Sequence, residues 1–90
     1  MKKIRWTLHA LEALVEREID RDEAEQAIHE PTATVPGHGN RAVLLRRYHD
    51  RPLGQEMLLC VVTEEQGDEV VIVTIYKTSR LAKRFKGGPS

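Results

Sequence analysis

Two spacings of apolar residues divide the chain into a helical part and a strand part. Near the N-terminus four apolar residues recur at steps of three or four, the period of one helix face: Leu8, Leu11, Val15 and Ile19. Leu14 widens this stripe, and Thr7 stands where a helix N-cap is expected. The pattern predicts an amphipathic helix over about residues 8–18.

A second, shorter helix is predicted directly after the first. Asp20 is followed three residues later by Glu23, an arrangement that resembles the capping box at the start of a helix. The helix is expected to end at about His29, because Pro31 follows and the residue before a proline avoids helical backbone angles.

The second half of the chain predicts three strands. Segment 31–40, PTATVPGHGN, is rich in turn residues and is expected to be a mobile loop. Strands are predicted over residues 41–49, 56–64 and 69–77, and the short turns between them favour antiparallel neighbours. The segment 56–64, EMLLCVVTE, has the longest apolar run and is therefore placed in the middle.

The first of these strands alternates between two faces. One face carries Ala42, Leu44, Arg46 and Tyr48, and the other carries Val43, Leu45, Arg47 and His49. Each face therefore holds both apolar and basic residues.

Together these elements predict an α+β fold, in which two N-terminal helices pack on a three- to four-stranded antiparallel sheet. The helices would cover one face of the sheet and leave the other partly open. We expect one domain over residues 1–86 and a disordered tail over residues 87–90, GGPS.

Charge is unevenly distributed in a chain whose formal net charge is zero. Residues 1–30 sum to −3, residues 31–54 to +3, residues 55–72 to −5 and residues 73–90 to +5. A neutral chain can therefore still present a basic surface, provided that the second and fourth blocks meet in the fold.

Cysteine content and hydropathy indicate a cytoplasmic protein. Cys60 is the single cysteine and lies within the apolar run MLLCVV, so it is expected in the core and not in an intrachain disulfide. No run approaches the roughly 18 apolar residues of a membrane span, and no membrane association is expected.

Several classes of site are disfavoured. The four histidines show no pair at a metal-ligand spacing, so neither a metal nor another cofactor is expected. Segment GHGN is not a phosphate-binding loop pattern. A nucleophilic triad lacks a suitable serine, because only Ser79 and Ser90 are present.

A cluster of basic and aromatic residues remains: Arg46, Arg47, His49, Tyr76, Lys77, Arg80, Lys83 and Arg84, with His9 on the first helix. Cleavage of RNA without a metal needs a base for the 2′-hydroxyl, a cation beside the phosphorus and an acid for the leaving oxygen. These residue types can supply all three, and Tyr48 and Tyr76 can stack on bases. The alternative is a solvated basic face without chemistry.

Two residues of the first helix have alternative interpretations. His9 either packs at the border of helix and sheet, with a bond to backbone or to Glu12, or faces the basic groove as acid or base. Arg17 either pairs with Asp20 or the helix C-terminal carbonyls, or shares a functional face with His9.

The order of motifs resembles a family of small bacterial proteins of undefined function. The shared pattern comprises His9-Ala10, then Glu16-Arg17-Glu18-Ile19, a capped second helix over Asp20 to Pro31, and finally Thr74-Ile75-Tyr76. The resemblance covers about residues 4–85. That family in turn resembles the BrnT branch of the RelE/ParE superfamily, the ribonuclease toxins of bacterial toxin-antitoxin modules.

The resemblance implies a compact toxin that is RNase-like or directed at gyrase or the ribosome, and that is neutralised by a cognate antitoxin protein. The preferred interpretation is a toxin-like, metal-independent endoribonuclease that meets RNA as messenger RNA or at the ribosome. Combined with the residue chemistry, it assigns catalysis to His9, Arg47, Tyr76 and Lys83, and RNA binding to Arg46, Lys77, Arg80 and Arg84. A second copy of the chain is another candidate partner.

A second hypothesis belongs to another class. The chain could be a non-catalytic binding module, such as a degenerate toxin that associates with itself through complementary acidic and basic faces. A small-molecule enzyme is a third alternative, and no motif supports it.

Overall fold

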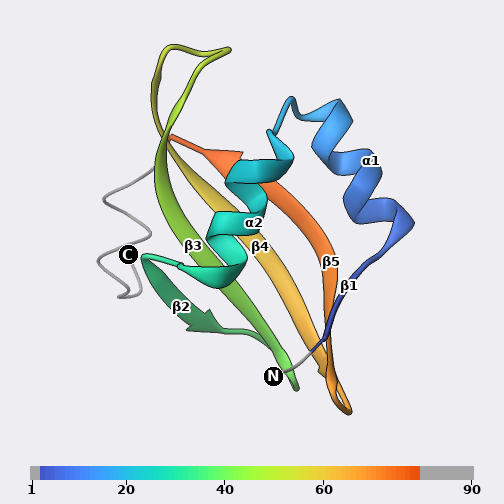
Figure 1. Cartoon of the computed structure of the whole chain (residues 1–90). Helices are drawn as coiled ribbons and strands as arrows, with labels where there is room; N and C mark the ends of the chain where they lie inside the picture. The colour runs from blue at the N-terminus through green and yellow to red at the C-terminus, as the bar shows by residue number, and fades with distance from the viewer. Residues whose placement is uncertain (1–2, 80–90) are drawn as a thin grey trace.

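The computed structural model describes residues 3–79 and contains seven elements (Figure 1). In chain order they are β1 (Lys3–Trp6), α1 (Leu8–Glu16), α2 (Arg21–His29), β2 (Ala33–Pro36), β3 (Arg41–Asp50), β4 (Gln55–Gln66) and β5 (Glu69–Thr78). The expected tail over residues 87–90 lies outside the described residues. Neither described helix is long and apolar enough to cross a membrane.

The strands form one mixed sheet of five in the order β1-β5-β4-β3-β2. The pairs β2–β3, β3–β4 and β4–β5 are antiparallel, whereas β1 pairs with β5 in parallel. The expected fold class, with two helices preceding a purely antiparallel sheet of three to four strands, is therefore wrong. A strand comes before the first helix, and the chain between the parallel neighbours β1 and β5 contains both helices and the other three strands.

Both strands that were not expected lie at the edges of the sheet. β2 occupies four residues of the segment expected to be a loop and pairs with β3 from Ala33↔Leu45 to Pro36↔Ala42. Pro36 lacks an N–H donor, and an edge strand tolerates that loss. The central position predicted for residues 56–64 is confirmed, because β4 lies between β3 and β5.

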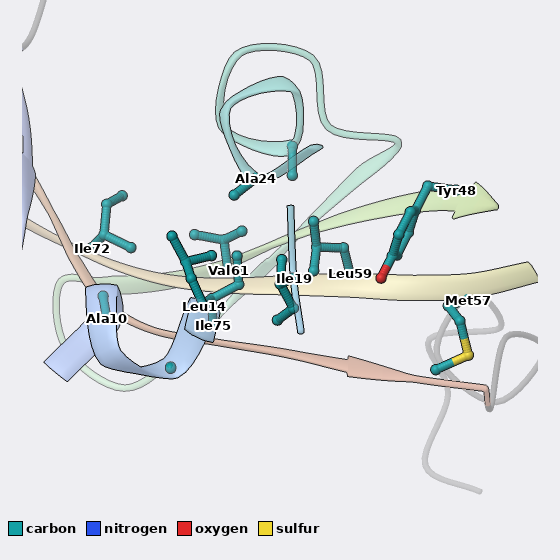
Figure 2. Close-up of a cluster of buried hydrophobic side chains, with 12 residues drawn as sticks. Ala10, Leu14, Ile19, Ala24, Tyr48, Met57, Leu59, Val61, Ile72 and Ile75 are labelled. Carbon is teal, nitrogen blue, oxygen red and sulfur yellow. The ribbon is translucent and has the colours of Figure 1, made fainter. Parts of the chain in front are cut away.

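Both helices pack on one face of the sheet (Figure 1), and the main hydrophobic core lies between the two layers. Figure 2 shows Ala10, Leu14, Ile19 and Ala24 from the helical part gathered with side chains of the strands, with Tyr48 and Met57 at one end. The opposite face carries a second cluster around Leu45, Leu58 and Cys60. The alternation predicted for β3 and the buried position of Cys60 are thus confirmed.

The buried side of α1 differs from the predicted stripe. Ala10, Ala13 and Leu14 face the core, whereas Leu8 and Val15 are 72% and 79% exposed. The two alanines lie three residues apart on one face, and their small side chains let the helix axis approach the sheet. A leucine or valine at those positions would hold the helix farther away.

The turn between the helices is a tight one. After α1, the N–H of Ile19 donates to the carbonyl of Leu14 at 2.9 Å and that of Glu18 to the carbonyl of Val15 at 3.3 Å. These two bonds are those of a Schellman motif, and Glu18 occupies its left-handed position with φ of 52°. Asp20 then caps α2, as predicted, by accepting from the N–H of Asp22.

Candidate functional site

The residues predicted to act on RNA lie on two different faces of the sheet. Arg47 and Tyr76 are on the face of the second cluster, opposite the helices. Arg46 and Lys77 point toward the helical layer, where their side chains bond to residues of α2 and to the end of α1. Three further predicted residues, Arg80, Lys83 and Arg84, lie outside the described residues.

Lys77 is held in a buried ion pair. Its Nζ donates to Oδ1 of Asp50 at 2.9 Å and to the carbonyl oxygen of Glu18 at 3.1 Å. The side chains of Lys77 and Asp50 are 12% and 2% exposed. Its ammonium group is thereby directed to structural partners and not to the face that carries Tyr76, so the geometry gives no support to the predicted RNA contact.

Asp50 is the centre of a network that joins three elements. Its Oδ1 also accepts from the hydroxyl of Tyr48 at 2.7 Å, and its Oδ2 accepts from the N–H of Leu53 at 2.9 Å. Burial alone would raise the pKa of Asp50, but the bonds from Lys77, Tyr48 and Leu53 outweigh it and lower that pKa below its ordinary value. For Tyr48, burial and the bond to the carboxylate raise the pKa.

Asp50 was not selected as a site residue from the sequence, although its place in the charge pattern could have indicated it. It is the only acid among residues 31–54, the basic second block of the chain. It also continues the helix-facing side of β3, two residues after Tyr48. A lone acid at an inward-facing strand position needs a buried cation, and Lys77 supplies it.

A pocket of about 640 Å³ adjoins this network between the start of α2 and the end of β3. Its lining includes Tyr48 and Asp50 together with Glu18, Asp22 and Arg51. The lining is predominantly acidic, which makes the pocket unsuited to a phosphate group. Among residues 3–79, no three His, Cys, Asp or Glu side chains gather in a position to hold a metal ion.

Arg46 stabilises the end of α2. One of its terminal nitrogens donates to the carbonyl of Glu30 at 3.1 Å and the other to Oε1 of Gln26 at 2.9 Å. A cation at a helix C-terminus is favoured by the helix dipole. The Nε of Arg46 is buried without a hydrogen-bond partner. These bonds give Arg46 a structural role at the C-terminus of α2 and do not direct it toward RNA.

His9 lies in the first turn of α1 and is exposed. Because α1 packs on the helix-covered face, the sheet lies between His9 and the face that carries Arg47 and Tyr76. The predicted catalytic set is therefore not brought together in the described part of the chain.

Arg17 connects the two ends of the motif pattern. Its guanidinium donates to the carbonyl of Ile75 at 2.8 Å and to the hydroxyl of Thr74 at 3.4 Å. Thr7, just before α1, also bonds to β5: its hydroxyl donates to the carbonyl of Ile72 at 2.8 Å. β1 pairs with β5 only as far as Ile72, so these side chains continue the contacts of that edge beyond the end of β1.

The structural-role interpretation of Arg17 is thus supported, although its partners differ from those expected. Neither Asp20 nor a carbonyl of α1 is its partner in these two bonds. Glu16-Arg17-Glu18-Ile19 and Thr74-Ile75-Tyr76 are far apart in sequence but meet at this contact.

A model of one protein family matches residues 6–77, most of the chain. The chain belongs to the family described as Domain of unknown function (DUF4258). No curated protein and no solved structure matches it. The DUF4258 match includes both segments joined by Arg17, but it ends before Arg80, Lys83 and Arg84.

Arg47 and Tyr76 share the face opposite the helices in this DUF4258 chain, together with His49. Arg47 pairs across the sheet with Leu58, which pairs with Thr78, and Tyr76 lies in the adjacent row opposite Cys60. With strands about 4.8 Å apart and a rise of about 3.4 Å per residue, the backbones of Arg47 and Tyr76 lie roughly 12 Å apart. Arg47 also forms a long, half-exposed ion pair of 3.7 Å with Glu56.

Proposed function

We propose that this protein is a cytoplasmic, toxin-like RNA-binding protein that uses the sheet face opposite its helices and cleaves RNA without a metal ion. The RNA would contact Arg47 and Tyr76. A cognate antitoxin protein would keep the chain inactive, as the resemblance to BrnT-like toxins implies. Family membership itself assigns no activity, because the family is one of unknown function.

One observation carries the RNA-binding part of the proposal. The row Arg47↔Leu58↔Thr78 places Arg47 two strands away from the end of β5. Residues 80–86, RLAKRFK, begin two positions after Thr78 and contain four basic residues but no acid. The topology therefore brings Arg47 and the end of β5 to the same end of the sheet. In the proposal, the charges of Arg47 and of the segment that follows β5 act on one phosphate chain.

The cleavage part depends on proton-carrying groups that share this face. His49 and Tyr76 are such groups in the described residues, and Arg47 is a cation that can neutralise charge on phosphorus. His9 is not included, because it lies on the other side of the sheet. Lys77 is not included either, because Asp50 and the Glu18 carbonyl hold its ammonium group.

RNA binding is tested by fluorescence anisotropy with a labelled single-stranded RNA over a range of salt concentrations. Arg47→Ala is expected to weaken binding and to reduce the slope of log affinity against log salt by about 0.7, the loss of one phosphate contact. Arg41→Ala is the matched control. Arg41 lies on the same strand and face, its side chain is similarly exposed at 49% against 54%, and it lies about 20 Å away.

The control variant should bind RNA like the unmodified chain. Absence of RNA binding at low salt would exclude the proposed function. Equal losses in Arg47→Ala and Arg41→Ala would place the RNA elsewhere on the protein.

Cleavage is tested by induced expression in bacterial cells, followed by growth curves and analysis of total RNA. The unmodified chain is expected to arrest growth and to fragment RNA, whereas Arg47→Ala/Tyr76→Phe should do neither and Arg41→Ala should do both. Purified protein should cleave RNA in the presence of a chelator. Soluble expression without growth arrest would contradict the toxin part, and cleavage that stops with the chelator would contradict the metal-independent part.

A second candidate function is a non-catalytic binding module, and α1 favours it. Leu8 and Val15 are large apolar residues on the outer side of this helix and are mostly exposed. Exposed apolar residues grouped on one helix are typical of a protein-protein contact. RNA binding without cleavage and without growth arrest would favour this function.

A further inference from the structure

We infer that the outer surface of α1 is a docking site for the basic C-terminal segment, residues 80–90, of a second copy of this chain. The outer surface of α1 is defined here by Leu8, Glu12, Val15 and Glu16. This inference deepens the second candidate function and does not depend on RNA binding or cleavage.

The surface combines an apolar stripe with a hollow. Leu8, Glu12 and Val15 follow one another at steps of four and three, so they lie on one side of the helix. Leu8 and Val15 are 72% and 79% exposed. A hollow of about 380 Å³ beside Val15 is lined by Glu12, Val15 and Glu16. An apolar side chain can occupy this hollow while a cation next to it meets the two carboxylates.

The charge around this stripe is negative. Residues 12–25 contain seven acids and two arginines, and both arginines have partners within the fold. Arg17 is bonded to Thr74 and to the carbonyl of Ile75. Arg21 lies over the ring of Trp6, 5.1 Å from its centroid, and pairs with Glu25. The helical layer therefore presents a surplus of carboxylates to a partner.

The C-terminal segment has the complementary chemistry. RLAKRFKGGPS carries four basic residues and no acid, and Leu81 and Phe85 are its large apolar residues. It lies outside the described residues and begins directly after Ser79. A symmetric contact between two α1 helices is disfavoured, because it would bring the carboxylates of Glu12 and Glu16 of both copies together.

Self-association is tested on the full chain by sedimentation velocity from micromolar to submillimolar concentration, at low and high salt. The unmodified chain is expected to associate reversibly, and the association should weaken at high salt because it depends on exposed charges. Val15→Asp should weaken it by about tenfold or more, the loss expected for one buried valine side chain. Leu53→Asp is the matched control, since Leu53 is exposed and apolar but lies outside α1, and it should associate like the unmodified chain.

A charge exchange identifies the occupant. Glu12→Lys/Glu16→Lys should abolish association, and so should Lys83→Glu/Arg84→Glu, but an equimolar mixture of the two variants should form a heterodimer. A synthetic peptide of residues 80–90 should bind the unmodified chain and compete with self-association. A chain that is monomeric at every concentration would overturn the inference, and so would association that survives Val15→Asp or a mixture that stays monomeric.

Discussion

Lys77 and Asp50 form an ion pair of 2.9 Å in which both side chains are almost fully removed from solvent. The pair joins the end of β5 to the end of β3, and the bond from Lys77 to the Glu18 carbonyl adds the turn after α1. Three segments distant in sequence are thus held by one ammonium group. The pair is a structural element of the same sheet end to which we assign RNA binding.

Removal of the Lys77 charge is expected to destabilise the fold strongly. Lys77→Met leaves the Asp50 carboxylate buried without its cation, and we expect a loss of about 3–5 kcal/mol in the free energy of unfolding. Arg47→Met is the control, because its 3.7 Å pair with Glu56 is half exposed and should contribute less than about 1 kcal/mol. Urea denaturation measures both, and similar losses in the two variants would contradict the structural role of the buried pair.

Asp50 is expected to make stability depend on acid pH. Its pKa in the folded chain lies below its value in the unfolded chain, so its contribution is present above about pH 4 and is lost as pH falls through the folded pKa. Denaturation at a series of pH values should show a smaller loss toward low pH in Asp50→Asn than in the unmodified chain.

A second carboxylate, that of Glu64, also contributes to the acid dependence of stability, so a Glu64 variant serves as a control in the same experiment. The hydrogen bonds from Arg41 and Gln66 lower the pKa of Glu64 as well, so it acts with the same sign. Because the side chain of Glu64 is 23% exposed, against 2% for Asp50, Glu64→Gln should change the acid-induced loss of stability less than Asp50→Asn does. The reverse order would show that the more exposed carboxylate dominates.

Glu18→Gly is expected to stabilise the protein. Glu18 has a φ of 52°, a left-handed conformation that glycine adopts at less cost than other residues, and we expect a gain of about 0.5–1 kcal/mol. The backbone carbonyl that accepts from Lys77 remains. Glu16→Gly, inside the last turn of α1, should instead destabilise by about 1 kcal/mol. Thermal unfolding monitored by circular dichroism measures both shifts, and a lower melting temperature for Glu18→Gly would contradict the prediction.

Arg17→Met is expected to destabilise the contact between α1 and β5. The variant keeps an apolar side chain but leaves the carbonyl of Ile75 without its charged donor, and we expect a loss of about 1.5 kcal/mol. Arg5→Met is the comparison, because the bonds of Arg5 to Gln66 and Glu69 are exposed and should contribute less than about 1 kcal/mol. Chemical denaturation measures the loss in the free energy of unfolding for both variants. An equal loss would contradict a larger structural contribution from Arg17.

The long elements were predictable because their periodicity is local. The cap at Asp20, the helix that follows it and the three long strands agree with the structure within one or two residues. β1 and β2 have four residues each, too few for a periodic pattern. Their strand conformation depends on pairing with β5 and β3, and residues distant in sequence supply that pairing.

The buried side of α1 was also not predictable from local sequence. Large apolar residues favoured a side that included Leu8 and Val15, but close approach to β5 selected the side with Ala10 and Ala13. Periodicity finds a helix and ranks its faces by hydrophobicity. It does not include the space between the helix and the sheet, which decides which side chains fit.

The sequence by itself determined which residues alternate across β3, that Cys60 is buried and that β4 is central, because these follow from local pattern and composition. Only the tertiary structure decided the partners of the charged residues. Lys77 is adjacent to Tyr76 in the chain, yet the pleat of β5 directs Tyr76 to the second cluster and Lys77 to Asp50. A sequence shows where charges stand along the chain, whereas their interactions depend on distance in space and on burial.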